Sequence, residues 1–163
     1  WRSFAVARGV GSNGADWVVR GNGEVRELHW PKTQAPVLDA SSGVTGFAPG
    51  PDGTYIHIDS GSAQVSFAAA AGNPASGANA TLPYIAEANG FVRRFERTPD
   101  GMRFDFGGHY QPFVKLANAQ TCRVSVDGRA VAAHRDGNAL RFDTQGVAGA
   151  AVDYQSVEVA CGR

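Results

Sequence analysis

The residues of this chain that are best suited to chemistry lie in one short segment in which polar and apolar side chains alternate. Tyr55, His57 and Asp59 are therefore expected on one face of a strand. Ile56 and Ile58 are expected on the other face, toward the core. An aromatic ring can stack on the apolar face of a sugar while carboxylate and imidazole groups bind its hydroxyls. The pattern predicts a carbohydrate-binding patch, and an ordinary solvated sheet face is the alternative.

Two further aromatic residues are candidates for the same contact. Trp30 precedes a proline, and Tyr110 lies between a glycine and a proline in the segment Gly108–Pro112. Because turn residues flank both rings, we expect them to be exposed. Trp17 and Tyr84 have apolar neighbours and are expected to pack in the interior.

Signatures of catalysis are weak in this sequence. Gly9–Gly14 matches the GxGxxG pattern of dinucleotide sites, but a strand pattern follows it where such a site needs a helix, so we interpret it as a turn-rich loop. Serines near His57 and Asp59 lack the GxSxG turn of a nucleophilic triad. We expect a noncatalytic chain, and a glycoside hydrolase or esterase whose carboxylates meet only in space is an alternative.

Neither a metal nor a cofactor is expected. His29, His109 and His134 lie in different segments, with no HxH or HExxH pattern beside them. The two cysteines are far apart in the sequence and form no CxxC pair, which is the spacing typical of zinc ligands.

The elements that would position these residues are short strands. The chain has 21 glycines and 8 prolines, and turn clusters separate its apolar segments, which is typical of an all-β sandwich or barrel. We predict an antiparallel, jelly-roll-like β-sandwich of about ten strands. The N-terminal segment 1–8 can be read as helix or strand, and 67–81 is predicted to be a loop. Two further segments, Val126–Ala130 and Arg135–Phe142, are each expected to supply a turn and strand residues. The other predicted strands are Asp16–Arg20, Glu24–Trp30, Thr54–Asp59, Ala63–Phe67, Tyr84–Ala88, Phe91–Arg97, Met102–Phe106, Thr121–Val126 and Gln155–Cys161.

A hairpin around Thr98–Gly101 allows its register to be predicted. If the turn closes symmetrically, Phe95 lies opposite Phe104 on the core face. On the other face, Glu96 lies opposite Arg103 and Arg94 opposite Asp105. Arg93 then falls in the apolar phase opposite Phe106, which indicates a sheet edge or a bulge at Arg93.

The two cysteines lie on the apolar phase of two alternating strands. The antiparallel register that pairs Cys122 with Cys161 also pairs Val124 with Val159 and Val126 with Val157. This agreement predicts a Cys122–Cys161 disulfide and hence an oxidising compartment. Two buried free thiols are the alternative.

Length and charge narrow the class of protein. A chain of 163 residues with 43% hydrophobic content is predicted to form a single domain, 1–163. Fifteen Lys and Arg balance fifteen Asp and Glu, so no global positive field attracts nucleic acid. No apolar run approaches the length of about 18 residues typical of a membrane span, and no membrane insertion is expected. Because the chain begins at Trp1, we expect a domain excised from a larger protein.

A succession of short motifs covers nearly the whole chain: Trp17–Gly21, Glu24–Leu28, Gly43–Phe47, Gly53–Ile58, Leu82–Ile85, Ala88–Gly90 and the strand containing Cys122. In this order they resemble the C-terminal β-sandwich module that follows the deacetylase domain in PelA-type exopolysaccharide hydrolase/deacetylase proteins. The resemblance implies a bacterial periplasmic or secreted module. The family's metal-binding and acidic catalytic residues match no motif here, so none is carried over.

The resemblance and the aromatic residues together predict a noncatalytic module. Its expected role is to bind an amino-sugar polymer or to position a catalytic domain of the same parent chain. Its predicted binding residues are Tyr55, His57, Asp59, Trp30 and Tyr110. A protein–protein interaction module that packs on a catalytic domain or an export partner is an alternative.

Overall fold

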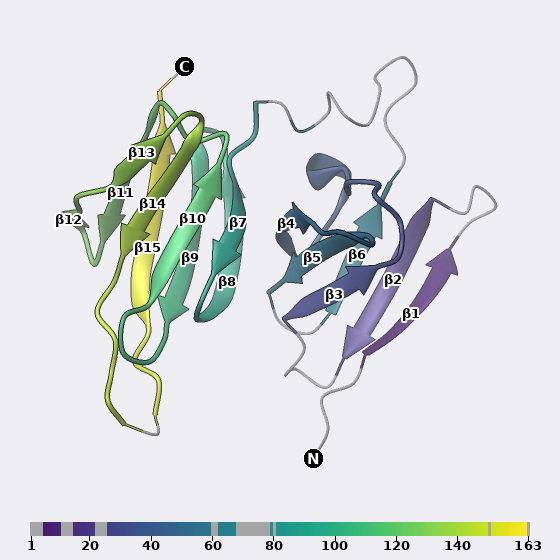
Figure 1. The fold of residues 1–163 in the computed structure, drawn as a ribbon, viewed down its shortest axis with the longest axis horizontal. Helices are drawn as coiled ribbons and strands as arrows, with labels where there is room; N and C mark the ends of the chain where they lie inside the picture. The colour runs from purple at the N-terminus through teal and green to yellow at the C-terminus, as the bar shows by residue number, and fades with distance from the viewer. Residues whose placement is uncertain are drawn as a thin grey trace. The chain divides into compact units, whose positions relative to one another are not determined.

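The structure, a computed structural model, describes residues 5–10, 15–21, 26–59, 62–67, 79, 81–149 and 151–162 (Figure 1). Within these residues the regular structure is almost entirely β, the strands of each sheet pair antiparallel, and the one helix is a single 3-10 turn. This confirms the predicted all-β class. The chain divides into two compact units, Trp1–Thr81 and Leu82–Arg163. The single domain over 1–163 stays a prediction.

The first unit holds two three-stranded sheets, with orders β1-β2-β6 and β3-β5-β4, and the 3-10 turn η1. Strand β4 was not predicted as a strand. The described part of the N-terminal segment is strand, and it includes Gly9 and Val10, which we had assigned to a turn-rich loop. The rest of the GxGxxG pattern, the start of the predicted strand at Glu24 and most of 67–81 lie outside the described residues. The elements are β1 Ala5–Val10, β2 Asp16–Gly21, β3 Glu27–Trp30, η1 Leu38–Ala40, β4 Val44–Pro49, β5 Thr54–Ile58 and β6 Ser62–Ser66.

Apolar side chains from both sheets form the interior of the first unit. The buried residues include Val19 and Val65 from one sheet and Ile56 and Ile58 from the other. Asn79 holds η1 in place, because its Oδ1 accepts a hydrogen bond from the backbone N–H of Leu38 at 3.0 Å.

The second unit is a sandwich of a four-stranded sheet, β13-β14-β10-β7, and a five-stranded sheet, β12-β11-β15-β9-β8 (Figure 1). With these, the described residues hold fifteen strands rather than about ten. The strand β10 was missed, and two of the additional strands are only two or three residues long. The strands are β7 Tyr84–Ala88, β8 Phe91–Thr98, β9 Gly101–Gly107, β10 Phe113–Ala117, β11 Cys122–Val126, β12 Arg129–Ala130, β13 His134–Asp136, β14 Ala139–Asp143 and β15 Gln155–Cys161.

Side chains from the two sheets of the second unit share one core. Phe104 and Val157 of the five-stranded sheet and Leu116 and Phe142 of the four-stranded sheet are all almost inaccessible to solvent. Inward-facing residues alternate with polar residues along each strand, as expected when two sheets pack face to face.

The disulfide and its register are as predicted. Strand β11 pairs antiparallel with β15, with Cys122 opposite Cys161, Val124 opposite Val159, and Val126 opposite Val157. The two sulfurs are bonded, and the bond closes a sequence separation of 39 residues. The disulfide therefore joins the last residue of β15 to the first residue of β11.

Replacement of both cysteines, Cys122→Ser with Cys161→Ser, should lower the free energy of unfolding of the second unit. The expected loss is about 4 kcal/mol, because a loop of about 40 residues is no longer closed in the unfolded chain. Denaturant titration measures it, and the reduced wild-type protein should match the double variant. Equal stability of the oxidised and reduced proteins would contradict the prediction.

The hairpin of β8 and β9 follows the predicted register only near its turn. Glu96 pairs with Arg103, but the register shifts by one residue at a bulge, so that Arg93, not Arg94, is opposite Asp105. Arg94 takes a left-handed backbone conformation there, with φ of 51°. A sheet edge or a bulge was predicted at Arg93, and both are found: the register shifts between Arg93 and Glu96, and β8 is the edge strand of its sheet. The bulge adds one residue to β8, so beyond it polar residues of β8 again face polar residues of β9, and apolar residues face apolar ones, as in Arg93 with Asp105 and Val92 with Phe106.

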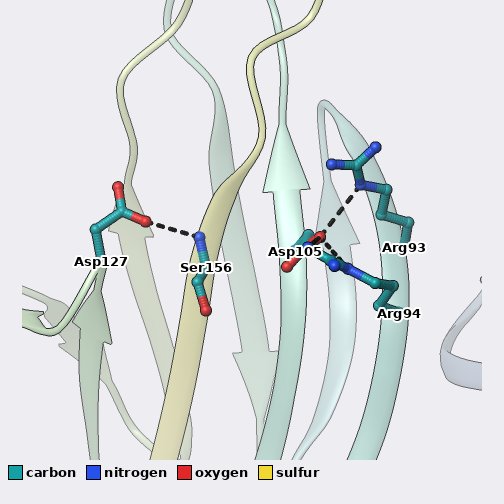
Figure 2. Close-up of polar contacts among 5 residues, drawn as sticks. All are labelled: Arg93, Arg94, Asp105, Asp127 and Ser156. Atoms are coloured by element: carbon teal, nitrogen blue, oxygen red, sulfur yellow. Dashed lines mark hydrogen bonds and ion pairs between the residues drawn. The ribbon is translucent and has the colours of Figure 1, made fainter.

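The bulge directs two arginines onto one carboxylate. The Nε atoms of Arg93 and Arg94 donate hydrogen bonds to Oδ2 of Asp105, at 3.2 and 2.6 Å (Figure 2). The side chain of Asp105 is only 9% exposed. On the same strand, exposed Arg103 lies opposite Glu96 as predicted, but its guanidinium forms an ion pair with Glu158 at 2.8 Å.

Asp105→Ala should lower the free energy of unfolding by about 1–3 kcal/mol, because two arginines lose a shielded acceptor. Glu158→Ala is the matched control. It removes a carboxylate from an exposed pair and should cost only about 0–1 kcal/mol. Chemical denaturation of both variants gives the comparison, and equal losses would refute the assigned role of Asp105.

Candidate functional site

The face predicted from the alternating segment lies on the sheet β3-β5-β4. Ile56 and Ile58 are buried as predicted, and Tyr55 and His57 are half-buried. The ring of Tyr55 lies 5.1 Å from that of His29 on β3. His57 Nε2 lies 3.2 Å from a carboxylate oxygen of Glu27. His29 and Glu27 were not predicted at this face, although the pairing of β3 with β5 places them there.

Two glycines allow the turn between β4 and β5 to pack closely against Tyr55 and His29 on this face. Gly50 and Gly53 bound the turn between β4 and β5, where the N–H of Gly50 donates to the carbonyl of Gly53 at 2.9 Å. A Cβ on Gly50 would collide with the ring of Tyr55. Asp52 of the same turn lies 3.2 Å from Nε2 of His29. Tyr55 is thus flanked by His29 and the turn, which leaves less of its ring for a ligand.

The other two predicted residues of the first unit lie differently. Trp30 is half-buried, stacks on Phe67 with ring centroids 4.7 Å apart and meets the edge of Trp17 at 4.9 Å. The expectation that Trp30 is exposed was wrong, because its ring lies on the same face of β3 as Leu28, toward the interior. Asp59 follows β5, is half-buried, and its N–H donates to the carbonyl of Gly43 at 3.0 Å.

Tyr110 differs from all of these and lies in the second unit. Its side chain is 82% exposed, as predicted, and its backbone φ is +61°. A bulky residue with positive φ is a clear outlier, and the left-handed conformation costs about 1–2 kcal/mol. The ring makes no packing contribution that would offset this cost.

Hydrogen bonds on both sides hold the loop that carries Tyr110. The side chain of Asn89 accepts from the N–H of Phe113 at 2.6 Å and donates to the carbonyl of Gln111 at 3.0 Å. The N–H of Thr144 donates to the carbonyl of Pro112 at 2.9 Å. These contacts fix the backbone around Tyr110 and keep its ring out in solvent.

Two adjacent hollows lie in this part of the second unit, and Tyr110 lines one of them. One, of about 490 Å³, is lined by Tyr110, Gln111, Arg141, Asp143, Thr144, Gln145 and Gly146. The other, of about 670 Å³, is lined by Val126, Asp127, Arg129, Ala130, Val131, Asp143, Thr144, Gln145 and Gln155. We name them the Tyr110 hollow and the Asp127 hollow. They share the segment 143–145, which begins at the last residue of β14.

The wall of the Asp127 hollow is a rigid polar network. Asp127 and Gly128 form the two-residue turn between β11 and β12, both with positive φ, as Asp-Gly turns prefer. The carboxylate of Asp127 accepts from the N–H of Ser156 at 2.9 Å (Figure 2) and from Nε2 of Gln155 at 3.2 Å. Oε1 of Gln155 accepts from the N–H of Gln145 at 2.9 Å, which ties the five-stranded sheet to the segment 143–145.

Charge is balanced over the two hollows taken together, because they are lined by two arginines and two aspartates. The guanidinium of Arg141 lies 4.0 Å above the ring of Phe113 and 3.7 Å from a carboxylate oxygen of Asp143. Arg129 and Asp127 line the other hollow. The arrangement offers hydrogen-bond donors and acceptors and one free aromatic face, which suits a polar ligand with an apolar side.

Groupings typical of a metal site are absent from the part of the chain that the structure describes, where no three His, Cys, Asp or Glu side chains cluster. In the same residues, no helix has the length and apolar character needed to cross a bilayer.

No family model matches the chain, and comparison with curated proteins and with solved structures gave no match. The resemblance to a PelA-type module therefore stays a prediction.

Tyr110→Asn should leave the free energy of unfolding unchanged or raise it by up to about 1 kcal/mol, because asparagine tolerates the left-handed conformation. Most substitutions of a large aromatic residue destabilise a protein. Thermal and denaturant unfolding of the variant measure the effect. A loss above about 1 kcal/mol would mean that Tyr110 has a structural role.

Proposed function

We propose that this chain is a noncatalytic carbohydrate-binding module. The observation that carries the proposal is Tyr110, an exposed ring held on an unfavourable backbone at the rim of a polar hollow. Unfavourable backbone conformations gather at ligand-binding sites, where the surrounding structure maintains them. A tyrosine ring stacks on the apolar face of a sugar, and the amides and charged groups of the hollow bind its hydroxyls.

A binding role accounts better for the acidic residues than catalysis does. Both carboxylate oxygens of Asp127 accept hydrogen bonds from neighbouring residues, so this group serves the fold. Asp143 lies 3.7 Å from the guanidinium of Arg141 and is largely exposed. A general acid is held in a setting shielded from solvent. Asp143 is largely exposed, and the hydrogen bonds of Asp127 serve the turn and the sheet.

The parent protein in this proposal modifies an exopolysaccharide made of amino sugars, as the PelA-type resemblance implies. The module would hold the polymer near a catalytic domain of the same chain, in the periplasm or outside the cell. The Cys122–Cys161 disulfide supports an oxidising compartment, because such bonds are rare in the cytosol of mesophiles.

Titration with partly deacetylated N-acetylhexosamine oligomers, followed by NMR and calorimetry, tests the proposal. Binding should shift resonances around the Tyr110 hollow. Tyr110→Ala should weaken binding about fivefold or more, the equivalent of about 1 kcal/mol of ring stacking. Tyr110→Phe keeps the ring and should retain most of the affinity.

Tyr55→Ala is the control that compares the Tyr110 hollow with the face of the sheet β3-β5-β4 that carries Tyr55. If it weakens binding and Tyr110→Ala does not, the site lies on the sheet β3-β5-β4 and the assignment to Tyr110 is wrong. The absence of any shift at millimolar ligand would refute carbohydrate binding by this chain.

A further inference from the structure

We infer that the Tyr110 hollow and the Asp127 hollow are consecutive subsites for an internal stretch of a linear, uncharged glycan. The inference rests on the proposed function and adds to it the length of ligand bound and its charge.

Continuity of the two hollows is the first argument. Both are lined by Asp143, Thr144 and Gln145, so they lie on either side of one short segment. Volumes of 490 and 670 Å³ each fall in the range of about 300–1,000 Å³ typical of small-ligand sites. Two such hollows side by side suit a ligand of several linked units better than a single ring.

The exposure of the lining residues that the two hollows do not share is the second argument. Tyr110 lines only the first hollow and is 82% exposed. Arg129 and Ala130 line only the second hollow and are also exposed. Because each hollow has solvent-exposed lining away from the shared segment, a polymer can continue past it. The geometry therefore favours the middle of a chain over a chain terminus.

Charge balance is the third argument. The Tyr110 hollow is lined by Arg141 and Asp143, and the Asp127 hollow by Arg129, Asp127 and the shared Asp143, so the pair together has two arginines and two aspartates. Asp127 already accepts two hydrogen bonds, and Arg141 lies over Phe113 and near Asp143. A sugar chain that spans both hollows therefore meets no net surplus of either charge. Uncharged units, such as N-acetylated hexosamines or plain hexoses, fit this lining.

Rigidity is the fourth argument. The N–H of Gln145 donates to Gln155, which in turn donates to Asp127, so the segment between the hollows is fixed to the wall of the second. Asn89 fixes the loop of Tyr110. Both subsites thus exist before the ligand arrives, which lowers the ordering cost of binding.

The test is a length series of fully N-acetylated hexosamine oligomers and of glucose oligomers, from the monosaccharide to the hexasaccharide. Their Kd values are measured by calorimetry at low and high salt. We expect the affinity of one series to rise at least tenfold with length and then level off, without dependence on salt. The fully deacetylated oligomers should bind more weakly.

Ala130→Trp separates the two subsites. Ala130 is exposed and lines only the Asp127 hollow, so the larger side chain should obstruct that hollow without disturbing the core. Long oligomers should then bind no better than short ones, whereas Tyr110→Ala should weaken both. Ala132→Trp, at an exposed residue that lines neither hollow, is the matched control and should bind like the wild type.

Three outcomes contradict these expectations, each at a different point. Failure of every oligomer to bind overturns the proposed function, and the inference with it. Binding that depends on Tyr110 but neither rises with length nor responds to Ala130→Trp keeps the proposed function and overturns the pair of subsites. Tighter, salt-sensitive binding of the deacetylated oligomers overturns the selection of an uncharged glycan.

Discussion

The pairing of β11 with β15 is the interaction on which the second unit depends. The Cys122–Cys161 disulfide closes this pair at one end. At the other end Asp127 and Ser156 exchange hydrogen bonds, because each backbone N–H donates to an oxygen of the other residue. With both ends held, the valines between them have a single register and reach the core together.

The same pairing determines where the candidate site forms. Gln155 begins β15, directly before Ser156, so the fixed register brings its amide to the carboxylate of Asp127 and to the N–H of Gln145. The wall of the Asp127 hollow is therefore a consequence of how the sheet closes. A ligand site that is formed by strand ends in this way needs little rearrangement when it binds.

At Tyr110 the candidate site has a cost in stability, whereas the wall of the Asp127 hollow follows from the interactions that stabilise the sheet. Its loop is held by Asn89, in the turn between β7 and β8, and by Thr144, directly after β14. A Cβ on Gly146 would collide with the carbonyl of Tyr110, so a glycine is needed where the two loops meet. The surrounding hydrogen bonds maintain a backbone conformation that the residue itself disfavours. We take this cost as the reason to assign a binding role to the ring.

The sequence by itself determined most of the strands, most of their faces and the disulfide, because alternation and cross-strand register can be read from residue types. It did not indicate β4 or β10. Cys122, Val124 and Val126 had a single consistent partner strand. The bulge between Arg93 and Glu96 was indicated only by the phase conflict at Arg93, since an extra residue leaves no other sign in the sequence. Tertiary structure alone decided that Trp30 faces the interior, that His29 and Glu27 join the face of Tyr55, and that the segment 143–145 lies between two hollows. All three features depend on which strand ends and loops meet in space. No sequence pattern predicts that Gln145 contacts Gln155.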